Sequence, residues 1–350
     1  MKPADQHNQQ TLVISAVAVN TAYGDHPVAL FGGIATRLSC REKVPGLQIN
    51  TPEQMIETPY WAANPELPPE LLPEVRLQLL CQGALEQLPP LPADLSDTLI
   101  VNQLPTTIAL RSLDCFTASL SASLPQSHSA TLRQQAADTT SSNLFKHNLS
   151  EFRNGPWQRL IFGSADCRID NNTVLEALQQ DNCCSDLNPD RCLLGEGAAY
   201  LMIEKVSQPA AGQIVIAGLA EQEEPNIGLA ASKPTSALAN SITSCLSQGS
   251  ITVEELTCLI TGYVPDMAGT LEWHQSERKL WPDTGRRPRT IEELNPHLGI
   301  GDCGSANLAL ALALACARFE FRVEPVSTIM ICDISDQPWR GAVCLQKVSG

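Results

Sequence analysis

The chain has 350 residues, of which 43% are hydrophobic and 17% charged, a composition typical of a globular protein with an ample core. Its formal net charge of -15 argues against a nucleic-acid-binding surface, because phosphate backbones select an excess of Lys and Arg. Anionic membranes and acidic carrier proteins are also poor partners, except where a local basic patch overrides the total charge. The densest basic cluster, which we interpret as a solvated loop, is Arg278, Lys279, Arg286, Arg287 and Arg289.

Thirteen cysteines are present, and their spacing matches neither a disulfide framework nor a zinc site. Cys183 and Cys184 are adjacent, and several others lie within apolar runs, where Cys packs as a small hydrophobe. An odd number of thiols without such a pattern is typical of a reducing compartment. The polar N-terminal residues do not resemble a secretory signal, and the apolar segment 307–319 is too short to span a bilayer. We therefore expect a cytoplasmic protein without a membrane span.

The first half of the chain opens with an apolar, β-branched run over 11–19, which predicts a buried strand. The proline-rich stretch 59–73 predicts an irregular surface excursion. Leu and Ala at helical spacing predict a helix over 76–88, which Pro89 ends. The further predicted elements of this half are strand 98–101, helix 139–152, strand 159–162, helix 173–178 and strand 199–204.

The second half opens with a strand over 213–217, whose Ile-Val-Ile-Ala resembles Leu-Val-Ile-Ser-Ala near the start of the chain. Strands that alternate with helices predict an α/β fold with a mostly parallel sheet covered on both faces. The repeated opening strand favours an internal duplication, with halves 1–207 and 208–350 packed as one unit. The further predicted elements of the second half are helices 236–246 and 306–319 and strands 257–260, 328–332 and 341–346.

The run Arg191-Cys-Leu-Leu-Gly-Glu-Gly-Ala-Ala-Tyr-Leu-Met-Ile-Glu204 predicts a tight, glycine-kinked turn that leads into an apolar strand. We expect Gly195 and Gly197 to supply backbone freedom, and Glu196 to hydrogen-bond buried main chain. The chain contains no phosphate-binding loop, dinucleotide fingerprint or metal-ligand spacing. We therefore expect neither a cofactor nor a metal.

Four segments in order along the chain resemble the β-ketoacyl synthases of the thiolase-like superfamily. They are the opening strand and turn 12–24, the strand that ends in Gly163-Ser-Ala-Asp166, the Gly195-Glu-Gly-Ala segment, and the small-residue turn 299–306 before a helix. The resemblance implies an α/β fold of the thiolase-like type, a five-layered αβαβα arrangement of two pseudo-repeated halves. It also implies a dimer formed by edge strands of the first halves.

The resemblance further implies the positions of a nucleophilic Cys and two His residues, and this chain has other side chains at all three. Asp138 stands at the nucleophile position, Tyr263 at the first His position and Asp302 at the second. A carboxylate cannot carry an acyl chain through the usual thioester. Asp138 is instead a good N-cap for the helix that follows, because its oxygen accepts hydrogen bonds from free main-chain N–H groups.

Cys303 is the best remaining candidate nucleophile, because it lies at a turn before the helix 306–319, where N–H groups stabilise a thiolate. The neighbouring Asp302 would raise the pKa of this thiol, and the nearest histidine in sequence is His297. The segment 333–341 replaces the glycine-rich gate of the family, and its Pro338 and Trp339 would stiffen the loop.

These departures predict a degenerate, non-catalytic β-ketoacyl-synthase-like scaffold that acts through protein–protein contacts. Two roles follow from resemblance: a partner like the chain length factors of active synthases, or an adaptor or chaperone like the synthase-like proteins beside type VI secretion effectors. We expect a homodimer, or a heterodimer with a synthase-like or secreted protein, and no small-molecule ligand. One alternative is an acyltransferase of the 3-oxoacyl-ACP synthase type that uses Cys303 with Asp302 or Tyr263. Another is an acyl-ligand sensor that binds without turnover.

Overall fold

The computed structural model describes residues 10–92, 94–105, 130–137, 141–227, 229, 232–263, 267–334 and 338–349. The long strands of the first half are β1 (Thr11–Thr21), β6 (Thr98–Pro105), β7 (Thr131–Ala137), β8 (Arg159–Cys167) and β9 (Leu194–Val206). The strands of the second half are β10 (Ile214–Glu223), β11 (Cys258–Gly262), β12 (Glu292–Leu294), β13 (Thr328–Ile334) and β14 (Trp339–Lys347).

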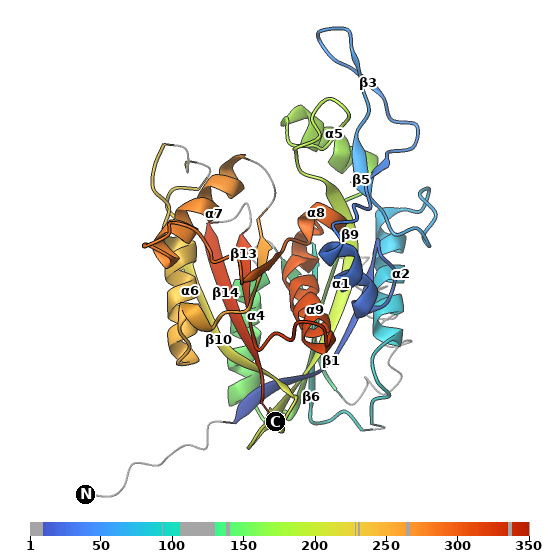
Figure 1. Ribbon diagram of the computed structural model, residues 1–350. Coiled ribbons are helices and arrows are strands. Elements are labelled where there is room, and N and C mark those ends of the chain that lie inside the picture. The colour runs from blue at the N-terminus through green and yellow to red at the C-terminus, as the bar shows by residue number, and fades with distance from the viewer. Residues whose placement is uncertain are drawn as a thin grey trace, which may run out of the picture.

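The helices cover the outer faces of this sheet and also lie between its two halves. They are α1 (Pro27–Ala35), α2 (Pro73–Glu86), α4 (Ser141–Asn154), α5 (Asn171–Gln179), α6 (Ala237–Gln248), α7 (Met267–Leu280), α8 (His297–Ile300) and α9 (Asn307–Glu320), with the 3-10 turns η2 (Val253–Glu255) and η3 (Gly304–Ala306). Four short strands form an arm that projects from the body (Figure 1): β2 (Glu42–Lys43), β3 (Ile49–Asn50), β4 (Ile56–Glu57) and β5 (Tyr60–Ala62).

The two halves of the chain repeat one strand order. The first half is ordered β7-β6-β8-β9-β1 and the second β12-β11-β13-β14-β10. When the five strands named above for each half are numbered in chain order, both halves have the spatial order third, second, fourth, fifth, first. The halves join where β1 pairs antiparallel with β10, with Val13 opposite Val215. The predicted pair of repeated halves is therefore confirmed, and the predicted boundary at 207/208 falls between β9 and β10.

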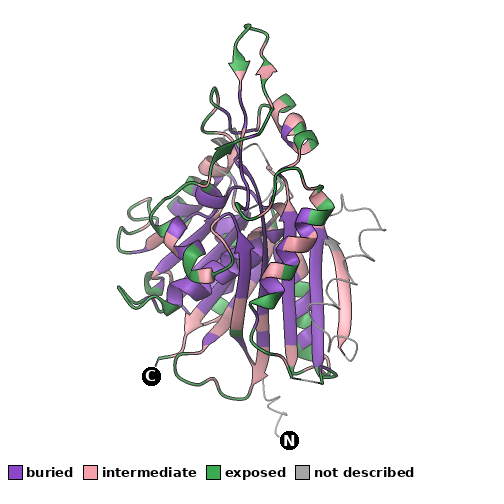
Figure 2. Ribbon diagram, turned by 90° about the vertical axis from the view of Figure 1, so that its right-hand side faces the viewer, coloured by how far each residue is buried: buried purple, intermediate pink, exposed green. Residues whose placement is uncertain are grey.

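The elements form five layers, as the resemblance implied (Figure 1). Helix α2 packs on β1, β8 and β9, and α6 packs on β10 and β14 with α7 outside it. Helix α9 lies between the halves, because it contacts β1 and β9 on one side and β11 and β13 on the other. Helix α4 packs beside it, against β10 and β14. Buried residues are concentrated along the strands and the inner helices (Figure 2).

The prediction of a mostly parallel sheet is wrong. Among the long strands, the pairings from β13 across to β8 are antiparallel and those toward the two edges are parallel; the short β5 also pairs in parallel with β9. The reason lies in the connections. Strand β13 ends at Ile334 and β14 begins at Trp339, which is too short a link for the crossover that parallel strands need. Of the expected stiffened gate, Asp333, Ile334 and Trp339 lie in these strands, and residues 335–337 are outside the described part of the chain.

The prediction of a glycine-kinked turn in the segment 191–204 is also wrong. Strand β9 runs without interruption from Leu194 to Val206, and neither Gly195 nor Gly197 has a positive φ. Gly195 is needed for a different reason: a Cβ there would lie 2.0 Å from the carbonyl oxygen of Ile300. The glycine therefore lets the turn before α9 approach the strand closely.

Most predicted strands and helices are present, while nine strands and helices of the described chain were not predicted: α1, β2, β3, β4, β5, β7, α7, α8 and β12. Strand β7 has the polar sequence Thr-Leu-Arg-Gln-Gln-Ala-Ala at an edge of the sheet, where burial imposes no apolar pattern. The helix predicted over 139–152 is α4, although residues 139–140 are outside the described chain. None of the helices in the described ranges is long and apolar enough to cross a bilayer.

A buried ion pair attaches α2 to the sheet. Glu196 of β9 is fully buried, and the guanidinium of Arg76 donates to both of its carboxylate oxygens. The main-chain N–H of Asn64 donates to Oε1 at 2.7 Å, and the Cys167 thiol lies 3.3 Å from Oε2. The predicted hydrogen bond between Glu196 and buried main chain is therefore confirmed.

Arg76→Met should lower the free energy of unfolding by about 3–5 kcal/mol, because it leaves the Glu196 carboxylate buried without a cation. Urea unfolding followed by circular dichroism measures the change. Lys146→Met is the matched control, since Lys146 is 47% exposed in its pair with Glu221 and should cost less than about 1 kcal/mol. Equal losses in both variants would contradict a structural role for the buried pair.

Candidate functional site

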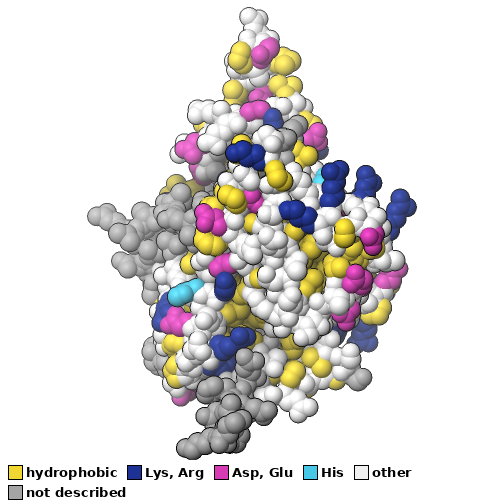
Figure 3. Space-filling model, turned by 90° about the vertical axis from the view of Figure 1, so that its left-hand side faces the viewer, with side chains coloured by type: hydrophobic (Ala, Val, Ile, Leu, Met, Phe, Trp, Pro, Cys, Tyr) yellow, Lys and Arg dark blue, Asp and Glu magenta, His cyan; other side chains and the backbone are white. Residues whose placement is uncertain are grey.

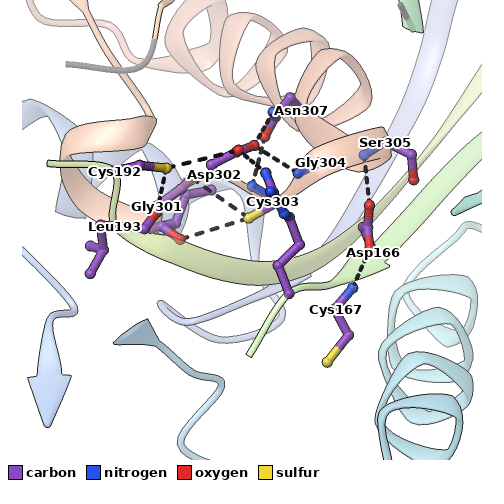
Figure 4. A network of polar contacts seen from close by, with 12 residues as sticks. Asp166, Cys167, Cys192, Leu193, Gly301, Asp302, Cys303, Gly304, Ser305 and Asn307 are labelled. Carbon is purple, nitrogen blue, oxygen red and sulfur yellow. Dashed lines mark hydrogen bonds and ion pairs between the residues drawn. The ribbon is translucent and has the colours of Figure 1, made fainter. Parts of the chain in front are cut away.

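The site grows from the start of α9, which is buried along almost its whole length. The first N–H groups of a helix have no partner within it, so a buried helix start requires acceptors from elsewhere. Helix α9 continues from the 3-10 turn η3, and two carboxylates supply acceptors for the N–H groups of that turn. The Gly304 N–H donates to Asp302 Oδ1 at 2.9 Å, and the Ser305 N–H donates to Asp166 Oδ2 at 2.8 Å (Figure 4). Asp166 ends β8, so this contact joins the two halves of the fold.

Asp302, which the sequence resemblance places at the family's second His position, is held as a charged carboxylate. Burial by itself would raise its pKa, but the Arg168 guanidinium, His297, the Asn307 amide and the Gly304 N–H together lower the pKa to about 2. Arg168 forms an ion pair with Oδ2, and Asn307 Nδ2 donates to Oδ1 at 2.7 Å. Both carboxylate oxygens of Asp302 therefore already have partners. Because the carboxylate is charged at neutral pH, it has no proton to donate.

The pKa of Asp166 is shifted in the opposite direction to that of Asp302. Burial raises its pKa to about 6, although the Ser305 N–H, the Arg168 guanidinium and the Cys167 N–H favour the charged form. The Cys167 N–H donates to Oδ1 at 2.7 Å. Two carboxylates at one helix start thus differ in charge state just below neutral pH.

Cys303 lies between these carboxylates and is fully buried. Its Sγ is 3.7 Å from the carbonyl oxygen of Ile300 and 3.8 Å from that of Gly301, which are acceptors rather than donors. Burial raises the pKa of the thiol well above its ordinary value, and the charges of Asp302 and Asp166 raise it further. The contribution expected from Asp302 is present, but burial is the larger cause.

Of the other two positions that the resemblance singled out, one is Tyr263 and the other is outside the described chain. Tyr263 follows β11 and stacks on Trp273 of α7, with ring centroids 6.3 Å apart and planes at 16°. Burial raises the pKa of its phenol. Asp138 lies outside the described residues. Just beyond it, the Ser142 N–H donates to Asp333 Oδ2 at 3.0 Å, so a carboxylate of the second half accepts from the start of α4.

Three residues of this region were not predicted from sequence as site residues: Arg168, Asp333 and His297. His297 opens α8, is buried, and has its pKa lowered by that burial despite the nearby Asp302. Arg168 stands two positions after Asp166, and that spacing at a strand end was a usable signal. The sequence around Asp333 contained no such signal, because only the packing of elements distant in sequence brings Asp333 to α4. Within the described ranges, no three His, Cys, Asp or Glu side chains gather as a metal site requires.

No protein-family model and no curated protein matches this chain. Solved structures do match over 97% of it. They include the ishigamide ketosynthase/chain length factor, at 14% identity and TM-score 0.71 over 100% of that chain. They also include a type II polyketide ketosynthase in complex with its acyl-carrier protein, at 13% identity, TM-score 0.71 and the same shares of each chain. A β-ketoacyl synthase from Burkholderia phymatum is 11% identical with TM-score 0.67, again over 100% of that chain.

These similarities show the fold: the chain is built as β-ketoacyl synthases are. At such low identity they do not transfer an activity. The residues at the helix start, described above, therefore carry the functional argument.

The opposite pKa shifts of the two carboxylates predict opposite effects of pH on stability. Native Asp302 has a pKa of about 2, below its ordinary 3.8, so it stabilises the fold above pH 4 and loses this effect as pH falls toward 2. The difference in unfolding free energy between wild type and Asp302→Asn should shrink by roughly 2 kcal/mol over that range.

Asp166→Asn should show the reverse sign. Native Asp166 has a pKa of about 6, so protonation stabilises the native state as pH falls from about 6 to about 4. Wild type should gain roughly 3 kcal/mol over Asp166→Asn in that interval. Urea unfolding at a series of pH values measures both differences, and two parallel curves would contradict the assigned charge states.

Proposed function

We propose that this chain is a non-catalytic β-ketoacyl-synthase-like scaffold that acts through protein–protein contacts. The observation that carries the proposal is Asp302, which resemblance places where the family has its second His. Its carboxylate is engaged by Arg168, Asn307 and the Gly304 N–H. A carboxylate held charged repels the developing oxyanion of acyl transfer, whereas that chemistry needs a hydrogen-bond donor.

The remaining candidate groups support the same proposal. An acyl-enzyme needs a thiolate that a thioester can reach, and Cys303 is buried with a raised pKa. The phenol of Tyr263 packs on Trp273, against α7. The alternative of an acyltransferase with displaced residues thus requires Cys303 to become both exposed and deprotonated.

For the partner, we favour a synthase-like chain, in the manner of a chain length factor. The fold similarity to a ketosynthase/chain length factor, over nearly the whole of both chains, supports this choice. An adaptor for a secreted protein is the second form of the same proposal. Mass spectrometry of proteins and lipids that co-purify from native cells separates the cases: an intact synthase, a secreted protein, or bound acyl chains as for a sensor.

Incubation with acetyl- and malonyl-acyl-carrier-protein should add no acyl mass to the intact protein. An active ketosynthase treated in parallel is the positive control, and Cys303→Ser is the matched variant. Acylation of wild type that is lost in Cys303→Ser would overturn the scaffold proposal in favour of the acyltransferase.

Iodoacetamide at neutral pH should leave Cys303 unmodified in the folded chain and modify it after unfolding in urea, because burial keeps the thiol protonated and inaccessible. Peptide mapping by mass spectrometry measures modification at each cysteine. Cys40, which is only partly buried, serves as the internal reference and should react before Cys303. Selective modification of Cys303 in the folded chain would contradict this expectation.

A further inference from the structure

In the described part of the chain, no strand pairs with the outer side of the sheet edge in the second half. Strand β12 is the last strand there and pairs in parallel with β11, with Leu259 opposite Glu293. The Glu292 N–H donates inward, to the carbonyl oxygen of Thr257 at 3.1 Å. Because successive residues of a strand direct their N–H and C=O groups to alternate sides, those of Glu293 face away from the sheet. They are placed to pair with a further strand.

An open pocket of about 510 Å³ follows this edge. It is bounded by β12 and the loop before it, by the end of α1, and by α8. Leu298, which is 54% exposed, contributes apolar surface to the pocket, whereas Ile34 and Ile291 are buried beneath it. An extended chain laid along β12 would therefore meet the side chain of Leu298 as well as the main-chain groups of Glu293.

The charged side chains that line this pocket have a net positive charge. Glu292 and Glu293 are each paired with an arginine of the same chain, at 2.5 Å in both cases. Arg37 and Arg289 have exposed side chains and form no ion pair with any carboxylate of the described ranges. Two uncompensated guanidinium groups thus flank an open strand edge in a protein of net charge -15. Such groups select carboxylates, which they bind through paired hydrogen bonds.

The structure corrects the interpretation of the basic cluster as a single solvated loop. Arg278 and Lys279 lie in the last turn of α7, whereas Arg287 is largely buried and pairs with Glu293. On the segment that leads to β12, the exposed members of this basic cluster are Arg286 and Arg289. Figure 3, which looks at the side of the molecule that carries α6 and α7, shows Lys and Arg side chains gathered at one part of that side.

We propose that β12 binds an extended, acidic peptide segment of a partner protein as an added strand. The peptide's main chain would pair with the N–H and C=O of Glu293, its acidic side chains would meet Arg37 and Arg289, and an apolar side chain would pack on Leu298. Because β12 has only three residues, few main-chain bonds can form, so the charges supply much of the affinity. The inference rests on the proposed function in that the ligand is a protein, but it does not require the site at α9 to be inactive.

Fluorescence anisotropy with a labelled peptide of about ten alternating Glu and Val residues tests the proposal on the full chain. Binding should weaken as salt is raised, and Arg37→Gln/Arg289→Gln should weaken it by at least about tenfold. Lys43→Gln/Arg153→Gln is the control, because it removes the same charge at exposed positions outside the pocket. It should leave the affinity unchanged within about twofold.

A second probe tests the strand pairing itself. The same peptide, N-methylated at alternate residues along one edge, keeps its charges and loses the donors that a new strand needs, so it should bind at least about tenfold more weakly. The proposal is overturned if the Glu–Val peptide does not bind, if a Lys–Val peptide binds equally, if both double variants lose affinity alike, or if N-methylation has no effect. The acylation assay is independent of these results, so failure here is distinguishable from failure of the proposed function.

Discussion

A buried helix start is the constraint on which the centre of this protein depends. Helix α9 is buried along almost its whole length between the two halves of the sheet, so water cannot satisfy the N–H groups at its start. In the 3-10 turn η3 that leads into it, Asp302 and Asp166 accept from the N–H groups of Gly304 and Ser305, one carboxylate from each half of the chain. The contact of Asp166 with Ser305 therefore also fastens the halves together.

This structural role conflicts with the catalysis found on the same fold. A β-ketoacyl synthase needs, at this place, groups that donate hydrogen bonds to an acyl oxygen. Asp302 is instead an acceptor whose charge Arg168 stabilises, and Cys303 is protonated because it is buried among carbonyl oxygens and carboxylates. The electrostatics that suit a buried helix start are opposite in sign to those that suit acyl transfer. A scaffold can keep the fold and lose the activity by such a change.

Much of the fold could be predicted because burial leaves a mark on composition. The apolar runs of β1, β8, β11 and β13 and the Ala/Leu repeat of α9 were found, since each is enclosed on both sides. Elements at the margins were missed. Strand β7 and strand β12 lie at the two edges of the sheet, and α7 covers the outside, so none has a strong apolar period. The direction of the central strands was also missed, because pairing direction depends on connections and not on residue type.

For the candidate site, the sequence by itself determined which chemical groups are available: the carboxylate of Asp302 and the phenol of Tyr263, which the resemblance places at the family's catalytic positions, and the thiol of Cys303 next to Asp302. Only the tertiary structure decided their protonation and accessibility. Arg168 follows β8 and Asp302 precedes α9, and the fold brings them into contact across 134 positions of sequence. Charge state depends on such long-range neighbours and on burial, neither of which a local pattern contains. The open edge at β12 is likewise a property of the assembled sheet, because a strand is an edge only by where its neighbours lie.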